Sequence, residues 1–147
     1  MDQIKNSDYY LDKITMENEL KSINLKMKKD GDKITSGFLP IKLENNNYVL
    51  CLKYKKNNEI VSFIHFVIKK NYLDLSKYIF VIYSYTFKNY RGLGFNTKLR
   101  VILEETAQFN KIPGIISIPF NESESRYVLN KLGYKNVKSD IFIKYIK

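Results

Sequence analysis

The chain has 147 residues, of which 44% are hydrophobic and 27% charged, a composition typical of one folded domain and not of a disordered chain. No apolar run reaches the roughly 18 residues of a membrane span, and the polar N-terminus lacks the apolar core of a signal peptide. We therefore expect a single domain over residues 1–147 that is soluble and cytoplasmic, without a membrane partner.

The net charge of +10 raises the question of a nucleic-acid partner. Arginine supplies only three of the 25 basic residues, and the lysines are spread along the whole chain. Base and phosphate recognition favours the arginine fork, so we do not expect nucleic acid as a partner. The positive field would still attract a small anionic ligand.

Cysteine and histidine each occur once, so neither an internal disulfide nor a structural zinc site is expected, and we predict no metal. Cys51 sits in an apolar strand-like run and is interpreted as a small core residue. His65 shares the face of a later run with apolar residues, which favours a buried sheet histidine over a catalytic base.

The first third of the chain predicts one strand and one helix. Residues 1–14 can hold a short first strand. The helix follows from apolar residues at spacings of four, three and four, with Thr15 as its N-cap and Gly31 as its end. Those apolar residues are Met16, Leu20, Ile23 and Met27.

Strands dominate the next segment. The runs "NYVLCLKYK" and "EIVSFIHFVIK" flank the short polar turn "KNN" and predict an antiparallel hairpin. The run "YIFVIYSYTF" at residues 78–87 is rich in aromatic and β-branched residues and predicts a central strand buried on both faces. Tyr83 and Tyr85 should lie on one face of that strand, with Ser84 and Thr86 on the other.

The last third alternates helices and strands. Leu99, Ile102, Leu103, Thr106 and Ala107 share one helix face, and this helix should end before Pro113. The stretch "GIISIPF" predicts a short buried strand. A capping box of Asn121 and Glu124 should open a second helix with Val128, Leu129 and Leu132 toward the core, which Gly133 ends before the final strand "DIFIKYIK".

The turn Arg91-Gly92-Leu93-Gly94 lies between the central strand and the helix that follows. A helix N-terminus presents unpaired N–H groups and the positive end of the helix dipole, and glycines allow a phosphate to approach the backbone. Arg91 adds a cation. The turn is therefore either a pyrophosphate cradle or a tight turn that needs glycine only for its dihedral angles.

Other glycine-rich phosphate loops do not fit these residues. A dinucleotide-binding fingerprint needs a third glycine, where this chain has Thr97. A Walker loop needs Gly-Lys-Ser/Thr, which is absent, and the kinase glycine loop precedes a strand and not a helix.

"YRGLGFNTKL" resembles the coenzyme A loop of the GCN5-related N-acetyltransferases, R/Q-x-x-G-x-G/A, with Arg91 and Gly94 in place and Asn96 at the last position. The family's later pattern of Asn, a short helix and Leu-Gly-Phe is matched by Asn121 and "KLGY". The order of the predicted elements agrees as well. The resemblance covers roughly residues 48–137 and implies an α+β fold: a mixed, mostly antiparallel sheet flanked by helices, with the central strands 79–87 and 114–119 splayed apart.

The resemblance also implies a cofactor, acetyl-CoA, and residues that would bind it. The pantetheine arm would pair with the central strand near Thr86, and Asn121 would hydrogen-bond the cofactor. The pyrophosphate would be held by the main chain and by Arg91. The residues of that turn are Arg91, Gly92, Leu93, Gly94, Phe95, Asn96 and Thr97.

The catalytic groups are harder to predict. The family often takes its acid from a tyrosine four residues before the Gly of Leu-Gly-Phe, where this chain has Leu129. The nearest hydroxyl is that of Tyr127, which is either the acid or a tyrosine at the rim. The predicted central strand has no carboxylate to act as a base, although its Tyr, Ser and Thr hydroxyls could hold a water chain. Glu104 and Glu105 are expected to face solvent.

The resemblance therefore implies an N-acyltransferase that moves an acetyl group from acetyl-CoA to a primary amine of a small molecule or protein. Direct transfer is expected, because no activated nucleophile is evident in the sequence. A homodimer is compatible with this expectation. The alternative is a degenerate member that binds coenzyme A or an acyl-CoA as a sensor or interaction module. A basic RNA-associated protein is the third hypothesis, which the scarcity of arginine disfavours.

Overall fold

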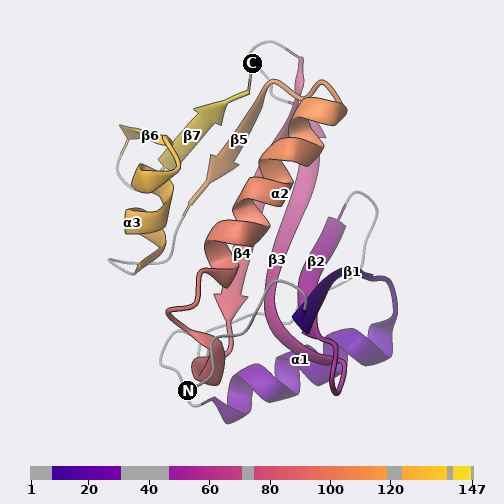
Figure 1. Cartoon of the computed structure of the whole chain (residues 1–147). Coiled ribbons are helices and arrows are strands. Elements are labelled where there is room, and N and C mark those ends of the chain that lie inside the picture. The colour runs from indigo at the N-terminus through magenta and orange to yellow at the C-terminus, as the bar shows by residue number, and fades with distance from the viewer. Residues whose placement is uncertain (1–7, 31–46, 71–74, 119–123, 139–140, 147) are drawn as a thin grey trace.

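The computed structural model describes residues 8–30, 47–70, 75–118, 124–138 and 141–146. Their strands form one seven-stranded sheet in the order β1-β2-β3-β4-β5-β7-β6 (Figure 1). The β4–β5 pair is parallel and the other neighbouring pairs are antiparallel. The strands are β1 Tyr9–Ile14, β2 Asn47–Tyr54, β3 Glu59–Lys70, β4 Lys77–Thr86, β5 Gly114–Ser117, β6 Lys135–Lys138 and β7 Ile141–Tyr145.

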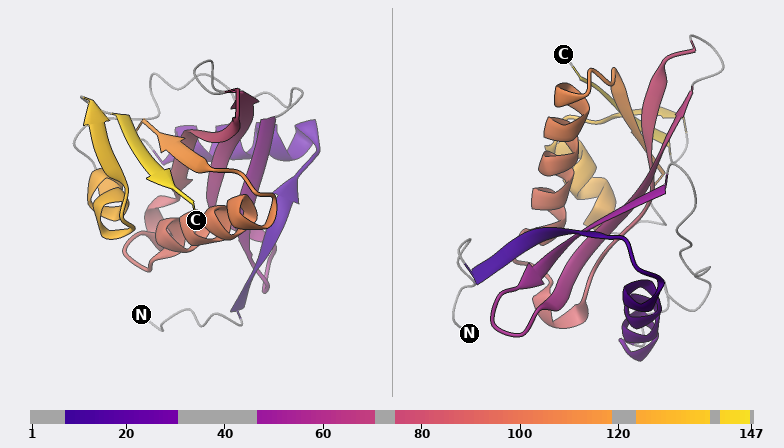
Figure 2. Two further views of the ribbon diagram at one scale, coloured as in Figure 1. Left: turned by 90° about the horizontal axis from the view of Figure 1, so that it is seen from above. Right: turned by 90° about the vertical axis from the view of Figure 1, so that its right-hand side faces the viewer.

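Three α-helices flank this sheet: α1 Glu17–Lys29, α2 Phe95–Phe109 and α3 Glu124–Lys131, with a short 3-10 helix, η3 Lys88–Tyr90, after β4. The predicted α+β class and the mixed, mostly antiparallel sheet are thereby confirmed. Figure 2 shows α1 on one face of the sheet and α2 on the other. None of the helices in the described ranges combines the length and apolar character needed to cross a bilayer.

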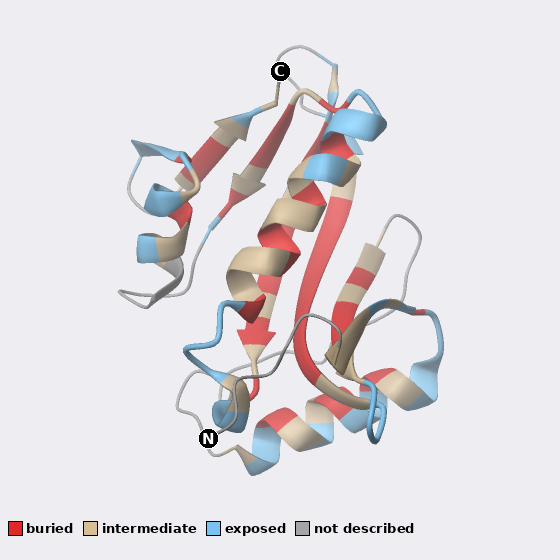
Figure 3. Cartoon of the chain, viewed as in Figure 1, coloured by how far each residue is buried: buried red, intermediate tan, exposed pale blue. Residues whose placement is uncertain are grey.

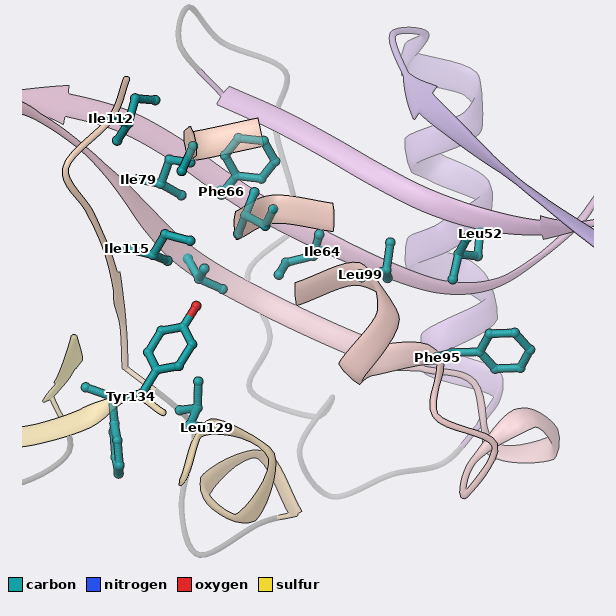
Figure 4. Packing of buried hydrophobic residues seen from close by; sticks show 14 of the residues in the cluster. Leu52, Ile64, Phe66, Ile79, Phe95, Leu99, Ile112, Ile115, Leu129 and Tyr134 are labelled. Carbon is teal, nitrogen blue, oxygen red and sulfur yellow. The ribbon is translucent and has the colours of Figure 1, made fainter. Parts of the chain in front are cut away.

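Each face of the sheet carries its own hydrophobic cluster. The α1 face is rich in aromatic rings, with Phe63, Tyr83, Tyr85 and Phe87 packed against the helix. The α2 face is largely aliphatic and includes the buried side of α2 and Leu129 of α3 (Figure 4). Burying these two sets of side chains is the main force that holds both layers of helices on the sheet.

A β-bulge in β4 changes which side chains face each helix. His65 pairs with Tyr83 and Phe66 with Val81, so Ile82 is an extra residue on β4. Val81 therefore lies in the α2 cluster, whereas Tyr83 lies in the α1 cluster. The predicted separation of Tyr83 and Tyr85 from Ser84 is confirmed, and the bulge is the reason that the small serine, and not a tyrosine, faces α2.

The parallel pairing of β4 and β5 is short. Only three pairs join the two strands, and the last is Val81 with Ser117. Beyond this point, which we call the strand junction, β4 continues to Thr86 paired with β3 alone within the described residues. Figure 1 shows the two strands separating toward their arrowheads, which confirms the predicted splay.

Several boundaries differ from the sequence-based predictions. The N-cap of α1 is Met16 and not Thr15, and no side chain caps this helix. Strand β6 was not predicted, because "KNVK" is fully exposed at the sheet edge and carries no apolar alternation. The predicted helix end at Gly31 and the capping residue Asn121 lie outside the described residues.

Candidate cofactor-binding site

The turn between β4 and α2 has the backbone geometry that its glycines predicted. Gly92 and Gly94 have φ angles of 79° and 84°, in the left-handed region that side chains rarely adopt. A Cβ atom built on either glycine would meet no heavy atom within 4 Å. Figure 3 shows this turn as an exposed segment. The two glycines therefore provide both the dihedral angles of a tight turn and open space beside the backbone.

Gly94 is the N-cap of α2, and no side chain caps the helix. The first amides of a helix have no partner within the helix itself, and they carry the positive end of its dipole. The amides of Phe95, Asn96 and Thr97 occupy this first turn. An anion beside the turn could therefore accept hydrogen bonds from main-chain N–H groups.

The side chains of the turn have separate roles. Phe95 is 3% exposed and packs edge-on against Tyr9, with 4.9 Å between ring centroids, so only its amide can face a ligand. Asn96 and Thr97 are half-buried, and the buried Oδ1 of Asn96 has no hydrogen-bond partner among the described residues. Leu93 is exposed.

Arg91 folds back onto the end of β4. Its Nε donates to the Thr86 carbonyl at 2.9 Å, and its Nη2 donates to the Tyr85 hydroxyl at 3.0 Å. The Tyr85 hydroxyl in turn donates to Asp30 at 2.9 Å, and Asp30 also accepts the amide of Lys88. A continuous polar chain thus links the end of α1 to the glycine turn.

Beyond the strand junction, no described strand pairs with the edge of β4 that faces away from β3. Ser62 Oγ donates to the Tyr85 carbonyl, which shows that this carbonyl points toward β3. Successive residues of a strand direct their N–H and C=O groups to opposite sides, so those of Ser84 and Thr86 point away from β3. The extended arm of a ligand could pair there as an added strand.

The residues considered for proton transfer differ in their exposure and in their hydrogen-bond partners. Tyr127 lies on α3 with 71% of its surface exposed, whereas Leu129 is fully buried in the α2 cluster. Three of the hydroxyls predicted to hold a water chain have protein partners: Ser84 binds Arg100, Tyr85 binds Asp30, and Thr86 binds Ser62. Asn121 lies outside the described residues.

His65 is a buried sheet histidine, as predicted. It is 7% exposed, and its Nε2 lies 2.9 Å from Asn47 Oδ1. Burial lowers the pKa of the imidazole, so the ring is neutral at pH 7. The contact with the Asn47 side-chain amide gives the imidazole a hydrogen-bond partner within the sheet.

Glu104 was expected to face solvent, and this prediction was wrong. Its carboxylate accepts a hydrogen bond from Lys144 Nζ at 2.8 Å, which ties α2 to β7. Glu105 is exposed, as predicted.

Arg100 was missed as a site residue. It is 1% exposed, and it donates to Ser84 at 3.1 Å and to Ser117 at 3.4 Å, so it lies at the strand junction. The sequence did contain a signal. Arg100 stands three residues before Leu103 and seven before Ala107, which puts it on the buried face of the predicted helix.

A cavity of about 270 Å³ lies on the α1 face of the sheet, between α1 and the β2–β3 hairpin. Two salt bridges line this cavity, one between Lys26 and Glu59 and one between Lys53 and Glu19. The hydrogen bond from Lys26 holds the pKa of Glu59 below its usual value. Because its charged groups neutralise one another, this cavity is a weaker anion site than the glycine turn.

No family model and no curated protein matches this sequence. Solved structures match its fold. Arabidopsis thaliana NAA60 in complex with acetyl-CoA superimposes with a TM-score of 0.72 over 94% of this chain and 98% of that chain, at 10% identity. The ribosomal-protein-S18-alanine N-acetyltransferase of Escherichia coli superimposes with a TM-score of 0.71 over 95% of this chain and 94% of that chain, also at 10% identity.

A GCN5-related glucosamine N-acetyltransferase region in a fungal multi-domain β-N-acetylglucosaminidase gives a TM-score of 0.68 at 15% identity, over 88% of this chain and 17% of that chain. The chain has the fold of the GCN5-related N-acetyltransferases. In this fold, α2 connects the two features, because it begins at the glycine turn and its Arg100 reaches the strand junction.

The buried His65 predicts a specific dependence of stability on pH. The pKa of the His65 imidazole is lower in the folded protein than in the unfolded chain. As pH falls, the unfolded chain therefore binds the proton first. The contribution of neutral His65 to the free energy of unfolding is complete above about pH 6.5, the pKa of histidine in an unfolded chain. This contribution is lost as the pH falls below that value. Urea denaturation should therefore give a free energy of unfolding that decreases between about pH 7 and pH 5.

The His65→Gln variant provides the control, because glutamine can still hydrogen-bond Asn47 but does not titrate. Its free energy of unfolding should be flatter over the same range. Equal pH slopes for the two proteins would contradict the burial argument.

Proposed function

We propose that this protein is an acetyl-CoA-dependent N-acyltransferase that moves an acyl group to a primary amine of a small molecule or protein. One observation carries the proposal: β4 parts from β5 after Val81 and Ser117, beside an uncapped helix start that two left-handed glycines leave open. Acetyl-CoA has a diphosphate, an extended amide-containing arm and a thioester. The site offers a complementary surface for each of these parts.

The diphosphate would be held by the main chain. Open space at Gly92 and Gly94 lets an anion reach the amides of the first turn of α2. The net charge of +10 draws a polyanionic ligand toward the protein. Arg91 lies at the turn, where it can contact a phosphate while it braces Thr86. Asn121 remains a proposed contact.

The pantetheine arm would pair with the open edge of β4, at the main-chain groups of Ser84 and Thr86. An amide-containing chain can add to such an edge as a strand does. The thioester, which is the activated acyl group that coenzyme A supplies, would then lie close to the strand junction. The β-bulge at Ile82 interrupts the regular β3–β4 pairing directly after Val81, the last residue of β4 that pairs with β5.

Direct transfer is favoured over a covalent enzyme intermediate. Cys51 is fully buried, and burial raises the pKa of its thiol to about 12. A protonated, buried thiol is not a nucleophile. The amine would therefore attack the thioester within a ternary complex, and we propose that it approaches from the α1 face, opposite α2.

Tyr127 is the proposed acid that protonates the departing thiolate. Its side chain is exposed, so a bound substrate could contact it without disturbing the core. His65 is a poorer candidate, because it is buried and placed against Asn47. The second candidate function, a coenzyme A-binding module with little turnover, is favoured by Leu129, which replaces the family's usual tyrosine with a buried apolar side chain.

The glycine turn predicts how acetyl-CoA changes thermal stability. At one hundred times its Kd, a ligand stabilises the folded state by about 2.7 kcal/mol, or roughly 5–10 °C in Tm for a chain of this size. Gly94→Glu places a side chain and a negative charge where the diphosphate would lie. The variant should lose the Tm increase that acetyl-CoA produces.

Gly133→Glu is the matched control. Gly133 has a similar φ of 86° and also has open space around its Cβ position, but it follows α3. It should lose similar intrinsic stability and keep the acetyl-CoA effect. An acetyl-CoA effect that survives in Gly94→Glu would refute the proposed cradle.

Tyr127→Phe separates the two candidate functions and tests the proposed acid. Free thiol released from acetyl-CoA with a panel of amines measures turnover. If Tyr127 is the acid, the variant should lose about 10²-fold in kcat and keep the acetyl-CoA effect on Tm. Tyr145→Phe, which alters another exposed tyrosine, should change neither quantity.

An unchanged kcat in Tyr127→Phe would make Tyr127 a rim residue. If no amine releases thiol from a wild-type protein that binds acetyl-CoA, the binding module is the better function.

A further inference from the structure

A buried arginine lies on α2 where the rest of the helix face is apolar. Arg100 is 1% exposed and is among the largest fully buried side chains of the described residues. Its neighbours on this face, Leu99, Leu103 and Ala107, are fully buried and apolar. Burying a charge in such surroundings is costly unless the charge is paired, and arginine stays protonated in proteins. The position therefore needs an explanation.

The partners of Arg100 in the described chain are neutral. Nη2 donates to Ser84 Oγ at 3.1 Å, and Nη1 donates to Ser117 Oγ at 3.4 Å. The buried Nε has no hydrogen-bond partner among the described residues, and none of their carboxylates forms an ion pair with this guanidinium. Among the described residues, the positive charge of Arg100 thus has only neutral hydroxyl groups as partners.

Tyr134 adds a second polar group to the same place. It is 4% exposed, and its buried hydroxyl lies beside the Arg100 guanidinium, with which it interacts. Figure 4 shows its ring reaching into the hydrophobic cluster. The Arg100 charge acts on this hydroxyl, while burial raises its pKa to about 12. The hydroxyl is therefore protonated and able to donate.

These groups lie at the strand junction. Ser117 is the last residue of β5 that pairs with β4, and Ser84 is the third residue of β4 beyond Val81. A side chain that reaches both serines from α2 must lie against the α2 side of the point where the strands separate. In the proposed function, the thioester of the acyl donor lies at this same point.

We propose that Arg100 determines the acyl group that the protein accepts, and that it selects a short acyl group ending in a carboxylate, of the malonyl or succinyl type, over acetyl. This inference rests on the proposed coenzyme A site and acyl transfer, and it replaces acetyl-CoA with a carboxylated acyl-CoA as the preferred donor. A carboxylate would give the guanidinium the counter-ion that the described chain withholds, through short charge-assisted hydrogen bonds. An acetyl methyl group would give the guanidinium no counter-ion.

The reaction itself is unchanged by this choice. The amine nitrogen forms a bond to the acyl carbon, the carbon–sulfur bond breaks, and the electron pair leaves with sulfur. The proton that the amine loses balances the thiolate as a thiol. The distal carboxylate takes no part in these steps and is retained in the amide product, which gains one negative charge relative to an acetylated product.

A structural role for Arg100 makes a different prediction. If the guanidinium only ties β4 to β5 through Ser84 and Ser117, its removal should weaken the binding of every coenzyme A ligand equally. If it reads the acyl group, its removal should affect only the ligands that carry a carboxylate. The two roles can therefore be separated by comparing ligands on the same protein.

The test measures Kd by calorimetry and ligand-induced Tm shifts for the wild-type protein with coenzyme A, acetyl-CoA, malonyl-CoA and succinyl-CoA. We expect at least one of the two carboxylated donors to bind about tenfold or more tightly than acetyl-CoA, as a gained charge-assisted hydrogen bond would give. This comparison needs no variant. Equal affinities for acetyl-CoA and both carboxylated donors would overturn the inference.

Arg100→Met keeps a long side chain and removes the charge. It should abolish the preference for carboxylated donors and leave the affinity for coenzyme A within about twofold. Arg126→Met, which removes an arginine on α3, is the matched control and should keep the preference. An equal loss for all four ligands in Arg100→Met would identify Arg100 as a structural tie and overturn the inference.

The outcomes also separate this inference from the function on which it rests. If no coenzyme A ligand changes the Tm, the proposed function fails and the inference fails with it. If coenzyme A and acetyl-CoA bind but the acyl group makes no difference, only the inference fails.

Discussion

The short parallel contact between β4 and β5 is the constraint on which the rest of the site depends. Three residue pairs hold the strands together, and the pairing ends at Val81 and Ser117. Because β3 still pairs with β4 as far as Thr86, the far end of β4 stays extended, and no described strand pairs with its other edge. A free edge inside a sheet is normally a liability, and proteins cover or pair it. Here it is the natural place for an extended ligand.

Polar contacts brace this edge from both faces of the sheet. On the α1 face, Asp30, Tyr85 and Arg91 connect the end of the helix to the glycine turn. On the α2 face, Arg100 reaches the junction through the hydroxyl groups of Ser84 and Ser117, and its partners among the described residues are all neutral. The contacts on the α1 face include a carboxylate, that of Asp30. On the α2 face, the charge of Arg100 has no counter-ion among the described residues. This asymmetry is why the α2 side is the better candidate for reading an acyl group.

The sequence predicted much of this arrangement, because strong local patterns coincide with the real elements. The aromatic run at residues 78–87 and the glycines after it correctly predicted β4, the turn and α2. The bulge at Ile82 could not be predicted, since it arises from pairing with β3. Strand β6 carries no apolar signal, because it is exposed at the edge. Arg100 was missed because a charged residue on a helix is usually at the surface, although its spacing from Leu103 placed it inside.

A crystal structure of the protein with coenzyme A is the most direct test of the proposed site. We expect the diphosphate against the amides of residues 95–97 and the pantetheine arm paired with Ser84 and Thr86 between the separated strands. This expectation would be contradicted by a diphosphate bound elsewhere, for example in the cavity beside α1, with the first amides of α2 hydrogen-bonded to groups of the protein itself.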